Sequence, residues 1–266
     1  MTVAVVTGAS SGIGLEIARG LVARGTTVAL VGRNLARLEA ARTAIGGHTH
    51  VFRADFAMLA DVRSLAAALR AQFARIDVLV NNAGLASWRR TVTADGFETT
   101  FQVNHLAPFL LTNLLLPAIA GRIVTVASHA HKRGRLDFDN LQRERGYVVY
   151  DAYAQSKLAN ILFTREMARR LAGSGVTATC CHPGVVATRI WEVNNVLRVL
   201  APLAGRFLLT PVQGADTPLW LATSAEVAGQ SGGYYARRQP VEPTAAAQDP
   251  AAAALLWAKS AGMVGL

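Results

Sequence analysis

The stretch that decides the fold is Val3-Ala-Val-Val-Thr-Gly-Ala-Ser-Ser-Gly-Ile-Gly14, near the N-terminus. It opens with an apolar, β-branched run, which predicts a short buried strand. Gly8, Gly12 and Gly14 follow, and a helical pattern of apolar residues then continues to Leu21. A strand, a glycine turn and a helix start in this order are the context in which a helix N-terminus binds the pyrophosphate of a dinucleotide.

The rest of the chain alternates between strand and helix patterns. Such alternation predicts one α/β domain over residues 1–266, with a Rossmann-type, doubly wound parallel sheet of about seven strands and helices on both faces. We expect a substrate lid at about 188–210 and a short C-terminal extension at about 236–266, with a mobile connection at 240–250. The expected strands are 3–7, 27–31, 49–53, 78–81, 121–127, 176–181 and 233–235, and the expected helices are 12–23, 35–45, 59–73, 94–116, 152–171, 211–222 and a last one from Asp249 to Lys259.

A second motif, Tyr153-Ala-Gln-Ser-Lys157, places a phenol and an ammonium one helical turn apart. A cation beside a phenol favours the phenolate, so we expect the pKa of Tyr153 to fall from about 10 towards neutrality. A phenol tuned in this way can donate or accept a proton at a carbonyl or alcohol oxygen. For an isolated motif, a surface Tyr and Lys on an amphipathic helix would be the simpler interpretation, and the other motifs of the chain decide against it.

The end of the second expected strand reads Val31-Gly32-Arg33-Asn34. Folds that bind NAD usually carry an acidic residue here to hold the ribose hydroxyls. This chain has no acid at that place, and a guanidinium can pair with a 2′-phosphate instead. We therefore predict NADP(H) in preference to NAD(H). An exposed arginine at a helix start is the alternative, and it leaves the missing carboxylate unexplained.

Ser128 ends the fifth expected strand, where open α/β sheets bind their ligands. Its hydroxyl can hydrogen-bond a substrate oxygen and stabilise developing negative charge. A serine hydrolase is not indicated, because no GxSxG motif surrounds this serine. His129 and His131 alternate by two, but no third ligand pattern accompanies them, so we expect no metal site.

Together, TGASSGIG, NNAG (residues 81–84), Asn104 in VNH, Ser128 and YAQSK make the chain resemble the short-chain dehydrogenase/reductase family. The resemblance covers essentially the whole sequence, with the motifs in the family's order and spacing. The stretches FQVNHLAPFLLT, LDFDNL, YAQSKLANILFTREMARRL and HPGVVAT resemble the retinol-dehydrogenase-like branch and its bacterial relatives.

The resemblance implies further roles for residues along the cofactor. Asp55, followed by Phe56, would bind the adenine amino group, and the NNAG backbone would pass the ribose while Asn81 braces the sheet. Asn104 would hold a water beside Lys157. Pro183, Gly184 and Thr188 would bind the nicotinamide carboxamide. The expected catalytic residues are Asn104, Ser128, Tyr153 and Lys157, and the expected cofactor contacts are Gly8, Ser10, Ser11, Gly12, Ile13, Gly14, Arg33, Asn34, Asp55, Phe56, Asn82, Ala83, Gly84, Tyr153, Lys157, Pro183, Gly184 and Thr188.

These motifs predict an NADP(H)-dependent oxidoreductase that transfers a hydride between the nicotinamide and a carbonyl or alcohol, with Tyr153 as proton donor or acceptor. An apolar stripe over residues 190–210 suggests an apolar substrate. Two alternatives stay open: an NADP-binding sensor or scaffold without turnover, and an NAD-preferring alcohol dehydrogenase of the same family. An epimerase or dehydratase of the extended relatives is disfavoured, since those carry the spacing GxxGxxG.

Composition adds limits on partners and location. The net charge is +10, but the basic residues are scattered, so we expect no nucleic-acid partner. Adjacent Cys180 and Cys181 suit core positions in a reducing compartment, and with no signal peptide and no apolar run of spanning length we expect a cytoplasmic protein without a membrane span.

Relatives commonly dimerise through the tyrosine-bearing helix and the helix before it. The charged segment 129–152 is long enough to obstruct that interface, so we expect a monomer or a weak homodimer.

Overall fold

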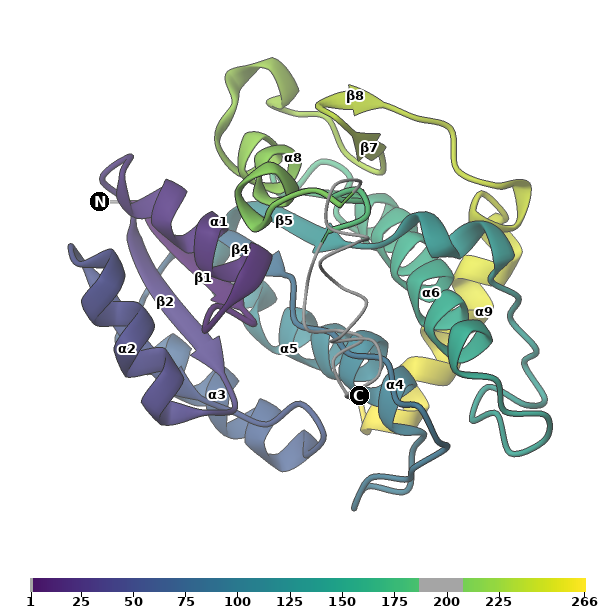
Figure 1. Cartoon of the computed structure of the whole chain (residues 1–266). Coiled ribbons are helices and arrows are strands. Elements are labelled where there is room, and N and C mark those ends of the chain that lie inside the picture. The colour runs from purple at the N-terminus through teal and green to yellow at the C-terminus, as the bar shows by residue number, and fades with distance from the viewer. Residues whose placement is uncertain (1, 187–207) are drawn as a thin grey trace.

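The computed structural model describes residues 2–186 and 208–266. Its strands are β1 (Val3–Thr7), β2 (Thr27–Gly32), β3 (Thr49–Arg53), β4 (Ile76–Asn81), β5 (Ile119–Val126), β6 (Thr177–Cys181), β7 (Tyr234–Ala236) and β8 (Gln239–Pro240). They form one sheet in the order β3-β2-β1-β4-β5-β6-β7-β8 (Figure 1). Every neighbouring pair is parallel except β7 and β8. The predicted doubly wound fold is confirmed, with eight strands in place of about seven.

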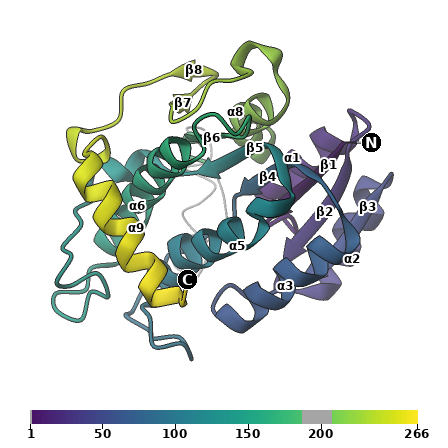
Figure 2. The same ribbon diagram turned by 180° about the vertical axis from the view of Figure 1, so that it is seen from behind.

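The helices form a layer on each face of this sheet (Figures 1 and 2). They are α1 (Gly12–Val22), α2 (Leu35–Ile45) and α8 (Pro211–Thr223) on one face, and α3 (Leu59–Gln72), α5 (Ala107–Leu115), α6 (Val149–Arg170) and α9 (Pro250–Val264) on the other. Side chains of a strand alternate between faces. In β1, Val3 and Val5 accordingly join the core under α3, α5 and α6, while Ala4 and Val6 join the core under α1 and α8.

The strand order reverses between β1 and β4, and this reversal positions the site. Crossovers from β1 and β4 leave toward opposite faces, so a crevice opens at the carboxyl ends of these two strands. The glycine turn follows β1, and the NNAG segment begins at the end of β4.

The helix expected over 94–116 is shorter and interrupted. It begins as α4 (Thr99–Phe101), because the Glu98 carboxylate accepts hydrogen bonds from the backbone N–H groups of Thr100 and Phe101 and so caps the helix there. A π-helical turn over Gln102–Leu106 then separates α4 from α5. Such turns occur frequently at functional sites, and this one contains Asn104.

The C-terminal part contains a strand that the sequence did not predict. β8 pairs with β7, and the Val241 N–H donates to the Tyr234 carbonyl at 2.8 Å, at the start of the segment 240–250 that was expected to be a mobile connection. The last helix, α9, continues beyond Lys259 to Val264 and ends at Gly265 in a left-handed conformation. Of the expected lid at 188–210, all but residues 208–210 lie outside the described residues.

Helix α9 lies against α6 and α5 (Figure 2). The Trp257 ring stacks on Phe163 with centroids 5.9 Å apart and meets Phe109 edge-on at 4.9 Å. The Arg170 guanidinium lies 4.2 Å from the Trp257 ring centroid. The extension thus adds apolar cover to one face of the domain. In residues 2–186 and 208–266, none of the helices combines the length and hydropathy needed to cross a bilayer.

Candidate active site

Backbone contacts shape the glycine turn between β1 and α1. Gly8 has φ +69°, in the left-handed region that favours glycine. A Cβ on Gly14 would lie 2.3 Å from the Gly8 carbonyl oxygen, so no other residue fits there. The Asn82 side chain donates to the Thr7 carbonyl at 2.8 Å, and the Thr7 hydroxyl accepts from the N–H groups of Asn82 and Ala83, both at 3.0 Å. These bonds fasten the turn to the end of β4.

A cleft of about 810 Å³ opens beside this turn. Its volume lies in the range typical of small-molecule and cofactor sites. Ser11, the N-cap of α1, makes no side-chain capping bond, an arrangement that suits an anion at the first-turn N–H groups. The residues therefore fit a dinucleotide. The predicted cofactor contacts in the wall of the cleft are Gly8, Ser10, Ser11, Gly12, Ile13, Gly14, Arg33, Asp55, Phe56, Asn82, Ala83 and Gly84.

The start of α2 contributes two arginines to the cleft. Arg33, which lies just before the N-cap of α2, was predicted there, and Arg37, in the first turn of α2, was missed although it stands only four residues later in the sequence. Asn34 is not in the cleft wall. Its side-chain oxygen instead accepts from the Arg37 N–H at 2.9 Å and caps α2.

Asn81 and Asp55 are also engaged by neighbouring protein groups. Asn81 donates to the Thr112 hydroxyl at 2.9 Å and so links β4 to α5, whereas the side-chain amide that bonds the end of β1 is that of Asn82. One Asp55 carboxylate oxygen accepts from the Ala57 N–H at 3.0 Å.

Tyr153 and Lys157 are both buried on α6, 7% and 3% exposed. The Lys157 ammonium donates to the Val126 carbonyl at the end of β5, at 3.0 Å, and lies 5.5 Å from the centroid of the Tyr153 ring. The Tyr153 side chain hydrogen-bonds that of Ser128. The structure thus brings three of the four predicted catalytic residues together at the carboxyl end of β5.

The expected direction of the Tyr153 pKa is wrong. Burial raises the pKa of Tyr153 to about 12, and the hydrogen bond from Ser128 lowers it only in part. The reason is geometric, since Lys157 directs its ammonium at the Val126 carbonyl. Burial also lowers the pKa of Lys157 to about 8. Near neutral pH the phenol is therefore protonated and can serve as a proton donor.

Asn104 lies near Lys157, on the other side of the backbone of the NNAG segment. Its amide exchanges two hydrogen bonds with the Leu85 backbone, both 2.8 Å, and donates to the Ser156 hydroxyl at 2.9 Å. A Cβ on Gly84 would lie 3.2 Å from the Asn104 amide oxygen and 3.5 Å from the Lys157 nitrogen. The glycine thus lets the backbone pass between these two side chains without a tight contact.

The last predicted contacts follow β6. Pro183 and Gly184 lie beyond its carboxyl end, with Gly184 at φ +87°. Its N–H donates to His182 Nδ1 at 3.1 Å. Thr188 lies outside the described residues.

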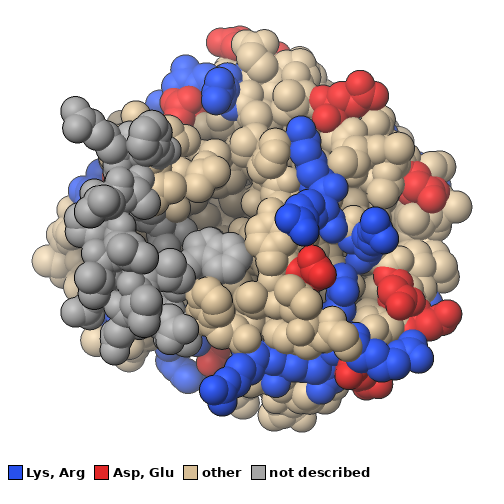
Figure 3. All heavy atoms as spheres, turned by 45° about the vertical axis from the view of Figure 1, so that its right-hand side comes forward, with Lys and Arg blue, Asp and Glu red and all other residues tan. Residues whose placement is uncertain are grey.

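A space-filling view shows a hollow on one face of the molecule, with a band of Lys and Arg beside it and Asp and Glu interspersed (Figure 3).

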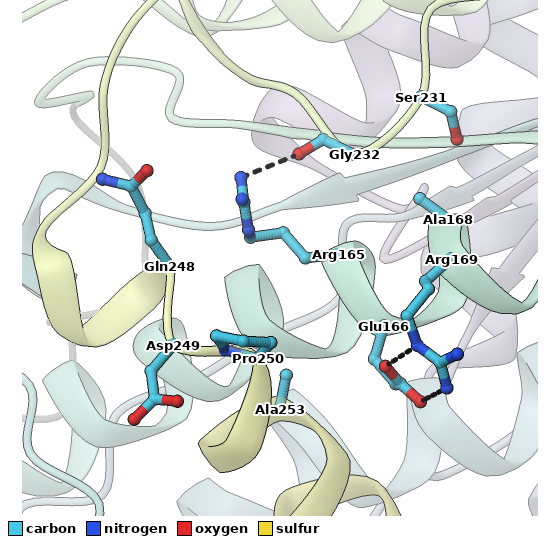
Figure 4. Close-up of a pocket in the computed structure, with 10 residues that line it drawn as sticks. All are labelled: Arg165, Glu166, Ala168, Arg169, Ser231, Gly232, Gln248, Asp249, Pro250 and Ala253. Atoms are coloured by element: carbon cyan, nitrogen blue, oxygen red, sulfur yellow. Dashed lines mark hydrogen bonds and ion pairs between the residues drawn. The ribbon is translucent and has the colours of Figure 1, made fainter.

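A second pocket, of about 430 Å³, lies at the far end of α6 near the start of α9 (Figure 4). There Arg165 donates to the Gly232 carbonyl at 3.4 Å and Arg169 pairs with Glu166. Arg165 is twelve residues, about 18 Å, along α6 from Tyr153. This pocket is therefore separate from the cluster of Ser128, Tyr153 and Lys157.

The fold and this cleft are typical of a nucleotide-binding oxidoreductase. The family model for short chain dehydrogenases matches residues 2–196, and the chain belongs to that family. It is an NAD(P)-dependent oxidoreductase.

Human relatives support the predicted branch. The chain is 39% identical to human retinol dehydrogenase 13, over 98% of this chain and 84% of the relative. It is 44% identical to human dehydrogenase/reductase SDR family member 13, over 99% and 73% respectively.

Bacterial proteins are similar as well. A protein of Streptomyces sp. (strain C5), named provisionally as a daunorubicin C-13 ketoreductase, is 44% identical over 98% of this chain and 91% of its own. The crystal structure of an uncharacterized protein from Mycobacterium paratuberculosis superposes with a TM-score of 0.85 at 36% identity, covering 100% and 94% of the two chains. Actinorhodin polyketide ketoreductase with NADPH gives a TM-score of 0.68 at 27% identity, covering 88% and 94%.

Proposed function

We propose that the protein reduces the carbonyl group of an apolar ketone or aldehyde with NADPH, and oxidises the corresponding alcohol in reverse. The observation that carries this is the buried Tyr153, which is hydrogen-bonded to Ser128 and stands one helical turn from Lys157, at the same edge of the sheet as the cleft.

The preference for NADP(H) rests on the start of α2. Arg33 and Arg37 both line the cleft at the carboxyl end of β2, and no carboxylate ends that strand. Two guanidinium groups favour a 2′-phosphate, which NAD lacks.

The bound nicotinamide would supply the hydride, and the chain's own residues would manage the oxygen. Tyr153 and Ser128 hold the carbonyl oxygen by hydrogen bonds, and Tyr153 gives it a proton as negative charge develops. Lys157, held by the Val126 carbonyl, keeps a positive charge near the phenol below a pH of about 8. Gly84 lets the backbone pass between Lys157 and Asn104, so the NNAG segment can lie along the ribose. Asn104 fixes the segment through Leu85, and we assign a water beside it to the proton path.

An apolar substrate is supported by the names of the relatives, which refer to retinol, to reduction of a daunorubicin ketone and to a polyketide. The test is an assay of the purified protein with NADPH or NADH. The panel contains a polyene aldehyde, a polycyclic aromatic ketone and a small polar ketone, and loss of reduced-nicotinamide absorbance is followed together with product identity. We expect NADPH-dependent reduction of an apolar member. Tight NADPH binding without turnover on any member would favour the sensor or scaffold alternative, and faster turnover with NADH would overturn the cofactor assignment.

A further inference from the structure

The backbone around Ser128 is held by His131. Ser128 begins a short 3-10 helix, His129–Arg133, and its hydroxyl accepts from the Ala130 N–H at 3.2 Å. Its carbonyl lies 3.1 Å from the backbone nitrogen of His131 and 2.8 Å from Nδ1 of the same residue. Two donors from one residue therefore fix the turn that aims the Ser128 hydroxyl at Tyr153.

A second histidine holds the turn after β6. His182 Nδ1 accepts from the Gly184 N–H at 3.1 Å, which closes a side-chain turn of the kind that Asn and Asp commonly form. Gly184 has φ +87°, so this turn is one that few other residues could adopt. The segment expected to meet the nicotinamide is thus shaped by the imidazole directly before it.

Tyr234 of β7 contacts both histidines. Its ring centroid lies 5.0 Å from that of His131, edge-on, and 6.0 Å from that of His182, nearly parallel. Its hydroxyl is 3.4 Å from His131 Nδ1, and the residue is buried. One rigid side chain therefore supports the two imidazoles that hold the two turns.

The hydrogen bonds require different tautomers. A carbonyl can only accept, so His131 carries its proton on Nδ1; an N–H can only donate, so His182 Nδ1 carries a lone pair. Burial lowers the pKa of His131, and burial together with the nearby positive charges of Arg237 and Lys132 lowers the pKa of His182 to about 4. Both rings are then neutral near pH 7.

We propose that His131 and His182, supported by Tyr234, are positioning residues: His131 orients the Ser128 hydroxyl, and His182 shapes the Pro183–Gly184 turn for the nicotinamide. This inference rests on the proposed function, because it takes the assigned roles of Ser128 and Gly184 as given. The two histidines should then act on different kinetic constants. His131 affects the step in which the substrate oxygen gains charge, and His182 affects the binding of the cofactor.

The test compares asparagine and leucine at each position. Asn Nδ2 can replace His Nδ1 as a donor at 131, and Asn Oδ1 can replace it as an acceptor at 182, while leucine keeps the size and removes both functions. We expect His131→Leu to lower kcat about 10-fold or more with the KM for NADPH within about twofold, since misplacing a catalytic group by 1 Å can cost about 100-fold. We expect His182→Leu to raise the Kd for NADPH about 10-fold with a smaller change in kcat. Each asparagine variant should recover most of the loss.

Several results would overturn the proposal. One is an asparagine variant as impaired as its leucine partner; another is an equal change of kcat and NADPH affinity in both leucine variants. If a leucine variant does not fold, as judged by circular dichroism, His131→Gln or His182→Gln replaces it, because the glutamine amide reaches the Nε2 position and misses Nδ1. Ser128→Ala is measured in parallel. If it keeps normal kcat, the role of Ser128 in the proposed function fails; if it loses kcat while His131→Leu does not, the present inference alone fails.

Discussion

At the scale of single residues, Lys157 carries a charge that the fold makes costly to keep. Burial lowers its pKa from 10.5 to about 8 in the folded protein. Between pH 8 and pH 10.5, Lys157 of the unfolded chain holds a proton that Lys157 of the folded protein has released. The free energy of unfolding then rises with pH by up to about 1.4 kcal/mol per pH unit from this group, and the gain is lost as the pH falls through about 8.

Lys157→Met removes this titration, so the difference in stability between wild type and variant should change with pH. We expect the wild type to gain on the variant by about 1–3 kcal/mol between pH 8 and pH 10. Urea unfolding of both cofactor-free proteins at several pH values measures it. A difference that stays constant over this range would show that the lysine keeps an ordinary pKa.

Arg33 and Arg37 are the residues on which cofactor choice depends. Arg33→Ala should weaken NADPH binding about 10–100-fold and NADH binding much less, because a charged hydrogen bond to the 2′-phosphate contributes about 1.5–3 kcal/mol. Arg37→Ala should act in the same direction. Arg42→Ala, on the same helix and paired with Glu39, is the matched control. Calorimetric titration of each variant with NADPH and with NADH measures these affinities. Equal weakening of NADPH and NADH binding by Arg33→Ala would refute the assignment of this residue to the 2′-phosphate.

At the scale of elements, Trp257 is one of the residues that attach α9 to the domain, beside the buried Ala253, Leu256 and Val264. This ring packs on Phe163, Phe109 and Arg170. Trp257→Ala should lower the free energy of unfolding by about 3 kcal/mol, the lower end for truncating a core tryptophan, since the ring is only partly buried. Leu255→Ala, at a position 44% exposed on the same helix, should change it little. Denaturant unfolding compares the two, and similar small losses would mean that α9 is not held by this ring.

The first seven strands could be predicted to within about two residues, most of them because their buried apolar runs are bounded by glycine and polar turns. β8 could not, since Gln239–Pro240 has no strand pattern and is defined only by pairing with β7. The π-helical turn at Gln102–Leu106 was equally hidden, because a single widened turn barely alters helical periodicity.

The candidate site, too, could be predicted only in part from the sequence. The positions of Ser128, Tyr153 and Lys157 follow from strand ends and helical spacing. The direction of the Lys157 ammonium and the hydrogen bonds of His131 and His182 depend on tertiary contacts, which no local pattern encodes.

At the scale of the whole molecule, α9 bears on assembly. It lies on α6 and α5, the tyrosine-bearing helix and the helix before it, through which relatives commonly dimerise. The preceding loop also packs here, with Leu141 buried and its carbonyl accepting from the Gln155 side chain at 2.8 Å. An interface needs an exposed apolar patch, and on this face other parts of the same chain already cover it.

We therefore expect a monomer or a weak dimer. Light scattering after size exclusion, at micromolar concentration, should give a mass near 28.2 kDa that rises little with concentration. A stable tetramer would contradict the expectation.

The central claim is that Tyr153 transfers the proton in an NADPH-dependent reduction. Tyr153→Phe removes only the hydroxyl, and Tyr150→Phe makes the same change three residues earlier on α6 as a control. The decisive measurement is turnover of both variants on an accepted ketone, with the Kd for NADPH determined in parallel. We predict that Tyr153→Phe loses at least about 10²-fold in kcat at an unchanged Kd while Tyr150→Phe stays near wild type. Near-normal turnover by Tyr153→Phe would contradict the assignment of the proton donor.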